Sequence, residues 1–169
     1  MKDHVDVDIK IDDQKLQEIL KKIKKEVGVK VGILGADGTK AVRGSDGKES
    51  DEKEKLTEAT LGAIHEFGSE KRNIPARSFL HMPLQKKLKE TLVKNSKFKS
   101  SVQRMNIDEI NGHIGDTAVA IIHEAFETGG FGEWAQIKEE TRKRKKGSDL
   151  ILVDSGDLER SITYEGLKK

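Results

Sequence analysis

The first 34 residues contain two stretches of alternating hydrophobic and polar positions with a helical pattern between them. The alternation covers residues 5–11 and 29–33 and is typical of strands with one buried face. Between them, hydrophobic residues recur every three or four positions and predict an amphipathic helix; they are Leu16, Ile19, Leu20, Ile23 and Val27. We expect Asp12 or Asp13 to cap this helix and Gly28 to end it, because glycine adopts the left-handed conformation without steric cost.

Residues 36–55 have almost no hydrophobic positions and are rich in glycine and charge. A loop of this length is unusual in a compact domain and is either functional or disordered. We therefore predict a flexible loop here. The hydrophobic positions of residues 56–67 could share one side of a helix, and a strand over residues 62–66 is the alternative.

Two further amphipathic helices are predicted in the middle of the chain. The first covers residues 79–92 and has Pro83 in or near its first turn, where proline is tolerated. The second covers residues 107–125 and has the most regular apolar side of the three. It also contains Gly112 and Gly115, each of which weakens a helix by about 1 kcal/mol relative to alanine, and which allow another backbone to approach closely.

Glycines interrupt the chain after residue 128. We predict a flexible arm over residues 129–148, made of a glycine-rich break and a short basic helix or turn. Residues 154–157 are typical of a turn, and residues 161–164 predict a last short strand. The whole pattern predicts one α+β domain over residues 1–169, with a small, mostly antiparallel sheet packed by about three helices.

The composition provides few hydrophobic residues for a core. Hydrophobic residues are 34% of the chain and charged residues 37%, so we expect extended elements, a disordered insert, or burial completed by neighbouring subunits. The net charge of +2 argues against a dedicated nucleic-acid-binding protein, which is usually clearly basic. The chain has no cysteine, no apolar segment typical of a signal peptide and no aliphatic run approaching a membrane span. We therefore expect a soluble protein made in a cytoplasm, without membrane contact.

The sequence contains no complete motif for catalysis or cofactor binding among those considered. His65-Glu66 and His123-Glu124 begin like the zinc-protease motif, but a second histidine four residues after the first is missing in both. The chain has neither a Gly-x-Ser-x-Gly nucleophile turn nor a phosphate-binding Gly-x-x-x-x-Gly-Lys-Ser/Thr loop. We expect no enzyme activity, no metal site and no cofactor.

Two basic segments leave a DNA-contacting role open. Residues 86–104 carry seven basic residues and one acidic one, and residues 142–146 read RKRKK. Such side chains contact phosphates, although a solvated charged face is the simpler interpretation. Arg77 lies between Pro75 and Phe79 and offers a planar fork to carboxylates or carbonyls, either at an interface or inside the protein.

Two segments together resemble a known family. The first contains AIHEFG at residues 63–68 and IPARSFL at residues 74–80. The second contains GFGEWA at residues 130–135, a basic stretch, and LVDSGDLERSI at residues 152–162. Both resemble the virion-morphogenesis and tail-completion proteins of tailed phages. Ser78 stands where proline is usual in that family, Ser155 stands where threonine is usual, and the Pro-Ala-Arg element precedes the tryptophan instead of following it.

The resemblance implies a structural role without catalysis. It implies a ring-forming tail-completion or neck subunit at the phage head–tail junction, present in the host cytoplasm during assembly and in the mature virion. Its partners would be further copies of itself, the connector or neck proteins and the tail tube or terminator, with possible contact to DNA in a channel. A minor tail or tail-terminator protein is the alternative within the same particle, and a basic DNA-contacting accessory module is the alternative of another class. The candidate interface or motif residues are His65, Phe67, Ile74, Pro75, Arg77, Phe79, Phe131, Trp134, Asp154 and Leu158.

Overall fold

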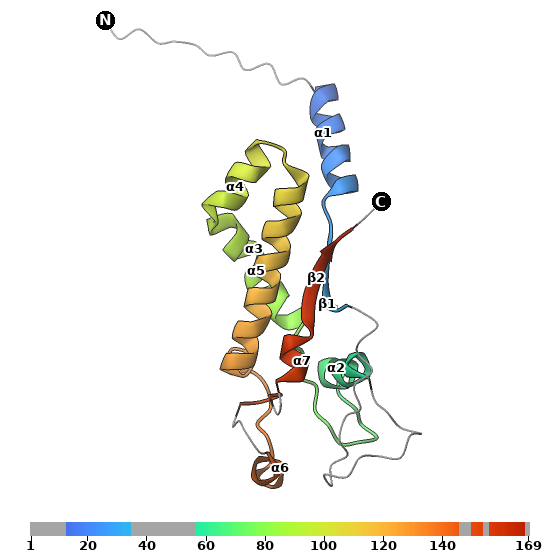
Figure 1. The fold of residues 1–169 in the computed structure, drawn as a ribbon, viewed down its shortest axis with the longest axis vertical. Coiled ribbons are helices and arrows are strands. Elements are labelled where there is room, and N and C mark those ends of the chain that lie inside the picture. The colour runs from blue at the N-terminus through green and yellow to red at the C-terminus, as the bar shows by residue number, and fades with distance from the viewer. Residues whose placement is uncertain (1–12, 35–56, 146–149, 154–155, 168–169) are drawn as a thin grey trace, which may run out of the picture.

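A long central helix and a two-stranded sheet organise the molecule (Figure 1). The computed structural model describes residues 13–34, 57–145, 150–153 and 156–167. Its elements, in chain order, are α1 (Asp13–Glu26), β1 (Val29–Ile33), α2 (Glu58–Phe67), α3 (His81–Lys94), α4 (Ser96–Gln103), α5 (Ile107–Thr128), α6 (Glu139–Arg144), α7 (Asp157–Arg160) and β2 (Ile162–Gly166). The α+β expectation is confirmed, with seven helices in the described ranges where we expected about three.

The sheet joins the two ends of the described chain. β1 and β2 pair antiparallel, with Val29 opposite Gly166 and Ile33 opposite Ile162. Directly opposed residues of an antiparallel pair lie on the same side of the sheet. The pair Lys30 and Glu165 makes an ion pair at 3.6 Å between exposed side chains, whereas Tyr164 belongs to the alternate set and lies against α5. The small sheet is therefore stabilised on one side by the longest helix.

The close contact between α5 and the sheet depends on a glycine. A Cβ atom on Gly115 would lie 2.1 Å from the ring of Tyr164, so no larger residue fits there without movement. Gly112, one turn earlier, has open space around it. A close approach is therefore found at Gly115, where the neighbour is the Tyr164 ring and not a backbone, and the expectation is wrong for Gly112.

The core lies where α3, α5, α7 and the segment after α5 meet. Phe79 and Phe126 are fully buried, with ring centroids 5.4 Å apart, and Trp134 stands edge-on to Phe126 at 5.6 Å. Such tilted and edge-on aromatic pairs add stabilisation beyond the area they bury. The remaining buried members are Ile122, Ala125, Ile151, Leu158 and Ile162.

Several predicted elements are found, and some have different limits. The predicted helices over residues 16–27, 79–92 and 107–125 correspond to α1, α3 and α5. The strand alternative over residues 62–66 is wrong, because α2 covers these residues. The predicted strand over residues 5–11 and the predicted loop over residues 36–55 lie outside the described residues. No helix among the described residues is long and apolar enough to cross a membrane.

The segment predicted to be a flexible arm, residues 129–148, begins inside the core. Gly129 ends α5 in the left-handed conformation, and Trp134 is only 4% exposed. Further along, the ammonium group of Lys145 donates hydrogen bonds to the carbonyls of Leu150 and Val153. Residues 129–134 are therefore part of the folded body, while residues 146–149 lie outside the described part of the chain.

Candidate functional site

The two sequence segments that carry the family resemblance meet in one place. The Arg77 guanidinium donates from Nε to the carbonyl of Ala135 at 2.9 Å and from one terminal nitrogen to the carbonyl of Gln136 at 3.3 Å. In return, Trp134 donates its indole N–H to the carbonyl of Ser78 at 3.0 Å. We call Glu66, Arg77, Ser78 and Trp134 the motif cluster.

Arg77 has an internal role in this arrangement. Its side chain is buried, and burial lowers the pKa of its guanidinium from the usual value. An arginine stays charged nonetheless, and its planar fork satisfies two carbonyls that a lysine, with its point charge, would contact less well. Of the two roles left open for Arg77, the structure supports the internal one.

Glu66 caps α3 from a distance. Its carboxylate accepts hydrogen bonds from the Ser78 hydroxyl at 2.7 Å and from the backbone N–H groups of Phe79, Leu80 and His81 at 2.8, 2.9 and 3.1 Å. Leu80, the residue at the capping position, provides no side-chain hydrogen bond. A carboxylate at a helix N-terminus satisfies otherwise unpaired N–H groups and interacts favourably with the helix dipole. Sequence reasoning missed this role, because it treated His65-Glu66 only as a possible metal motif.

Ser78 bridges Glu66 and α3. Its hydroxyl donates to Glu66 and accepts from the backbone N–H of Met82 at 2.9 Å. A proline could make neither hydrogen bond. Serine at this position therefore provides a polar link that proline could not provide.

His65 lies beside the motif cluster in a half-buried position. Its carbonyl accepts a hydrogen bond from the N–H of Arg77 at 2.7 Å. Burial, and then the charge of Arg77, lower the pKa of the imidazole from 6.5 to about 4. Its Nδ1 atom is buried without a hydrogen-bond partner in the structure. Among the described residues, no three potential ligands from histidine, cysteine, aspartate and glutamate lie close enough to hold a metal ion.

The motif glycines are required by geometry at two positions. Gly68 has φ +78°, and a Cβ there would lie 2.8 Å from the backbone nitrogen of Ala76. Gly130 has φ +69°, and a Cβ there would lie 2.3 Å from the Trp134 ring. Side-chain-bearing residues rarely adopt such positive φ values. Both glycines therefore hold the motif segments in contact.

An apolar groove of about 520 Å³ lies next to the motif cluster, between α2, the start of α3 and the end of β1. Ala59, Ala63 and Phe67 line it from α2, Leu80 and Leu84 from the α3 side, and Ile33 from β1. The Phe67 side chain is 81% exposed. An exposed aromatic side chain beside an apolar groove is typical of an interaction surface.

The other candidate residues have mixed positions. Leu158 is buried in the core, Ile74 is half-buried and paired with Ser69, and Pro75 is exposed. The ammonium group of Lys87 lies 4.0 Å above the ring of Phe131. Asp154 lies outside the described residues. Arg77, Phe79, Trp134 and Leu158 are thus buried inside the protein, whereas Phe67 lines the groove and is largely exposed.

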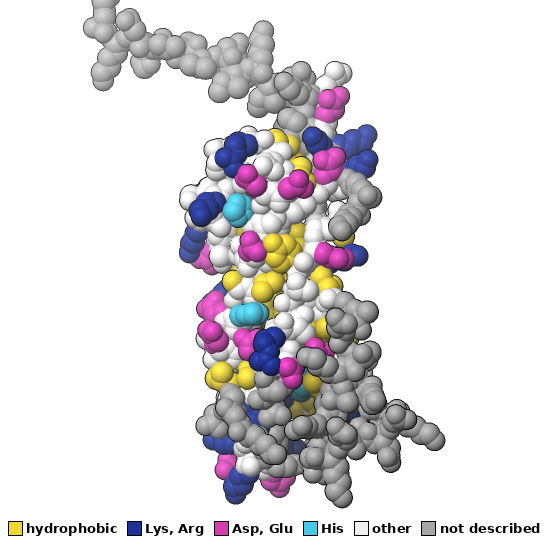
Figure 2. Space-filling model, viewed as in Figure 1, with side chains coloured by type: hydrophobic (Ala, Val, Ile, Leu, Met, Phe, Trp, Pro, Cys, Tyr) yellow, Lys and Arg dark blue, Asp and Glu magenta, His cyan; other side chains and the backbone are white. Residues whose placement is uncertain are grey.

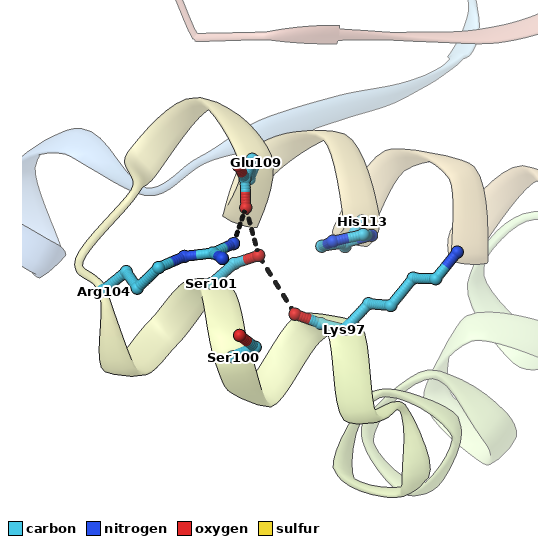
Figure 3. Close-up of a pocket in the computed structure, with 6 residues that line it drawn as sticks. All are labelled: Lys97, Ser100, Ser101, Arg104, Glu109 and His113. Atoms are coloured by element: carbon cyan, nitrogen blue, oxygen red, sulfur yellow. Dashed lines mark hydrogen bonds and ion pairs between the residues drawn. The ribbon is translucent and has the colours of Figure 1, made fainter.

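A second, polar hollow of about 220 Å³ lies between α4 and α5 (Figure 3). The Glu109 carboxylate accepts hydrogen bonds from the Ser101 hydroxyl at 2.6 Å and from the Arg104 guanidinium. The hydrogen bond from Ser101, opposed by partial desolvation and helped by Arg104, keeps the pKa of Glu109 below its usual value. The Ser101 hydroxyl also lies 3.0 Å from the carbonyl of Lys97. These interactions join the two helices.

The surface in Figure 2 carries charges of both signs, with hydrophobic side chains in the middle of the face, over α5 and the sheet. Four of the seven basic residues of the segment 86–104 are paired: Lys86 with Glu133, Lys87 with Glu124, Lys94 with Glu90 and Arg104 with Glu109. The segment is therefore less positive in the structure than its sequence predicts.

Comparison of the chain with protein-family models, with curated proteins and with solved structures found no match.

Proposed function

We propose that this protein is a structural subunit of a tailed-phage particle, which completes the tail or joins it to the head as part of a ring. The observation that carries the proposal is the pairing of the two segments that resemble tail-completion proteins. Arg77 and Ser78 of one segment bond directly to residues 134–136 of the other. Residues far apart in the sequence that resemble one family thus form one structural unit.

The surface features fit such a role. A ring subunit needs a stable body and surfaces that neighbours cover, and it needs no catalytic residues. The motif cluster stabilises the body, and the apolar groove beside it, with Phe67 exposed, is a surface that a neighbour can cover. The neighbours would be further copies of the chain, the connector or neck proteins, or the tail tube. A minor tail or terminator position in the same particle remains the alternative.

Electron microscopy of phage particles made without this protein tests the proposal. We expect filled heads and separate tails, and rescue when the protein is supplied. Heads joined normally to normal tails would refute a joining or completing role. A matched pair of rescue variants refines the test: Phe67→Ser removes the exposed aromatic of the groove, and Val93→Ser removes an exposed apolar residue elsewhere. We expect rescue by the second variant and reduced rescue by the first.

The DNA-contacting alternative is less well supported. Ion pairs neutralise more than half of the basic residues in the segment 86–104, and the chain is nearly neutral overall. A protein that neutralises several phosphates loses affinity steeply as salt is raised. We expect no such salt-dependent binding of duplex DNA, and a steep slope would favour the alternative.

A further inference from the structure

Residues 134–136, which we call the strap, are tied to the body by the motif cluster. The Arg77 guanidinium donates to the carbonyls of Ala135 and Gln136, and the Trp134 indole donates to the carbonyl of Ser78. Ala135 and Gln136 are themselves exposed. Three hydrogen bonds to residues 77 and 78 therefore connect an exposed stretch of backbone to the interior.

The strap follows a turn that can change its conformation without unfolding α5. Gly129 ends the helix, and Gly130 and Gly132 follow it with positive φ values of +69° and +82°. Glycine moves between positive and negative φ at little steric cost. The strap can therefore swing away from residues 77 and 78 while the helix before it keeps its hydrogen bonds.

Trp134 connects the strap to the aromatic core. It is 4% exposed and stands edge-on to the fully buried Phe126, with ring centroids 5.6 Å apart. Movement of the strap would carry this indole into water and uncover the Phe126 ring. Because Trp134 is the single tryptophan of the chain, its fluorescence reports this movement alone.

His65 lies directly beside the arginine that holds the strap. Its carbonyl accepts a hydrogen bond from the N–H of Arg77 at 2.7 Å, and its imidazole Nδ1 is buried without a hydrogen-bond partner among the described residues. The Arg77 guanidinium donates to carbonyls, which carry no full negative charge to balance a second cation. A protonated imidazole would therefore place an unmatched positive charge next to a buried guanidinium, and like charges repel strongly where water is excluded.

Other charged groups near α2 do not offset this repulsion. Burial, and then the charge of Arg77, lower the pKa of His65 to about 4. The elements that contact α2 are β1 and α7. Lys30 of β1 pairs with Glu165 on the exposed side of the sheet, and Arg160 of α7 pairs with Asp157. The remaining charged residues of α2 and α7 are Glu58, Glu159 and Glu66, the last of which caps α3.

We propose that protonation of His65 is a switch that frees the strap from Arg77 and opens the core at Trp134, while α3 and α5 stay folded. The open form exposes the imidazole to water, where it binds a proton more readily, so a fall in pH favours opening. Because the pKa is about 4 in the closed form and 6.5 for a solvated imidazole, acid raises the ratio of open to closed molecules by at most about 300-fold. The switch acts within a single chain, so it does not depend on the proposed place in a phage particle.

Acid titration of the purified full chain from pH 7.5 to 3.5 tests the switch. Trp134 emission and its quenching by acrylamide report the strap, and far-ultraviolet circular dichroism reports the helices. We expect the emission to move to longer wavelength, with greater quenching, at a midpoint between pH 4 and 6.5 and before helix content falls. Emission and helix content that change together would show global unfolding and overturn the proposal.

His65→Gln isolates the contribution of the imidazole. Carboxylates also bind protons near pH 4, and this variant leaves all of them in place. We expect it to move the fluorescence midpoint to lower pH, whereas His81→Gln, at an exposed histidine, should leave the midpoint unchanged. An unchanged midpoint in His65→Gln would overturn the proposal.

Nuclear magnetic resonance of the wild type gives a test that does not require the variant to fold. The imidazole proton signal of His65 should titrate with the same midpoint as the Trp134 emission, because protonation and opening are one coupled event. Backbone amide signals of residues 134–136 should move with that midpoint, and those of central α5 should not. A His65 titration at a different midpoint, or amide shifts spread equally over α5, would contradict the switch.

Discussion

At the scale of single residues, Glu66 performs a role that is usually given to the residue at the start of a helix. Its carboxylate accepts four hydrogen bonds, from the Ser78 hydroxyl and from the three backbone N–H groups of residues 79–81 at the start of α3, and the residue is 8% exposed. Glu66→Gln keeps the shape but replaces one acceptor oxygen by an N–H₂ donor and removes the negative charge. We expect a loss of about 2–4 kcal/mol in the free energy of unfolding, measured by urea, because hydrogen bonds to charged groups each contribute about 1.5–3 kcal/mol.

The matched control for Glu66→Gln is Glu70→Gln, which makes the same chemical change at an exposed position. We expect a change below about 0.5 kcal/mol there, as is usual for surface substitutions. Equal effects at both positions would contradict the capping role of Glu66.

His65 makes stability depend on pH. The folded protein lowers the pKa of this imidazole from 6.5 to about 4, chiefly by burial, so the unfolded chain binds more protons between these values. Stability is therefore full above pH 6.5 and falls as the pH is lowered, by at most about 2 kcal/mol between pH 7.5 and 5, since one pKa unit corresponds to 1.36 kcal/mol. Urea unfolding at both pH values measures the loss.

His65→Gln should remove most of this pH-dependent loss, because the glutamine does not titrate. His81→Gln, at an exposed histidine, should retain it. A loss of the same size in His65→Gln would show that other groups cause it.

The two motif segments made several residues of the site predictable from the sequence. They did not predict the structural role of each residue. His65, Arg77, Phe79, Trp134 and Leu158 stood out in the sequence as motif residues. Their burial and mutual hydrogen bonds depend on contacts between segments more than 50 residues apart, which spacing alone does not specify. The role of Glu66 was missed for the same reason, since its partners lie 12 to 15 residues further along the chain.

At the scale of elements, α5 contains a natural matched pair of glycines. Gly112 has open space around it, and Gly115 faces the Tyr164 ring. Gly112→Ala should raise the free energy of unfolding by about 1 kcal/mol through helix propensity. Gly115→Ala gains the same propensity but forces the Tyr164 ring and the sheet to move, which typically costs about 1–3 kcal/mol, so we expect no gain or a net loss.

Urea unfolding of both glycine variants tests this expectation. Equal stabilisation would contradict a tight contact between α5 and β2. Retained helix content in both variants would show that the difference arises from packing and not from the helix itself.

The hydrophobic pattern predicted the long amphipathic helices and the short strands β1 and β2, but it missed the short helix α4. α1, α3 and α5 each have an apolar side that recurs over at least three turns. The separate helix α4 was missed, because its start is set by Asn95, whose side-chain oxygen accepts from the N–H groups of Lys97 and Phe98. The expected arm over residues 129–148 overlooked the burial of Trp134, which depends on the turn at Gly130. Local glycine content indicates freedom of the backbone, but tertiary packing decides whether that freedom remains.

At the scale of the whole molecule, stability should be unevenly distributed. α5 contacts the sheet, α3 and α4, whereas the described hydrogen bonds of Asn111 join the body to the C-terminal end of α1. Opening free energies within one protein range from near zero for weakly packed parts to the global value for the core. Hydrogen exchange of a dilute, monomeric sample should therefore show α1 amides exchanging at low opening free energy and central α5 amides exchanging only on global unfolding.

The same measurement separates a helix that is anchored mainly at its C-terminal end from one that is packed along its whole length. If α1 is as well protected as α5, further contacts within the chain hold the helix, and the expected uneven distribution of stability is wrong.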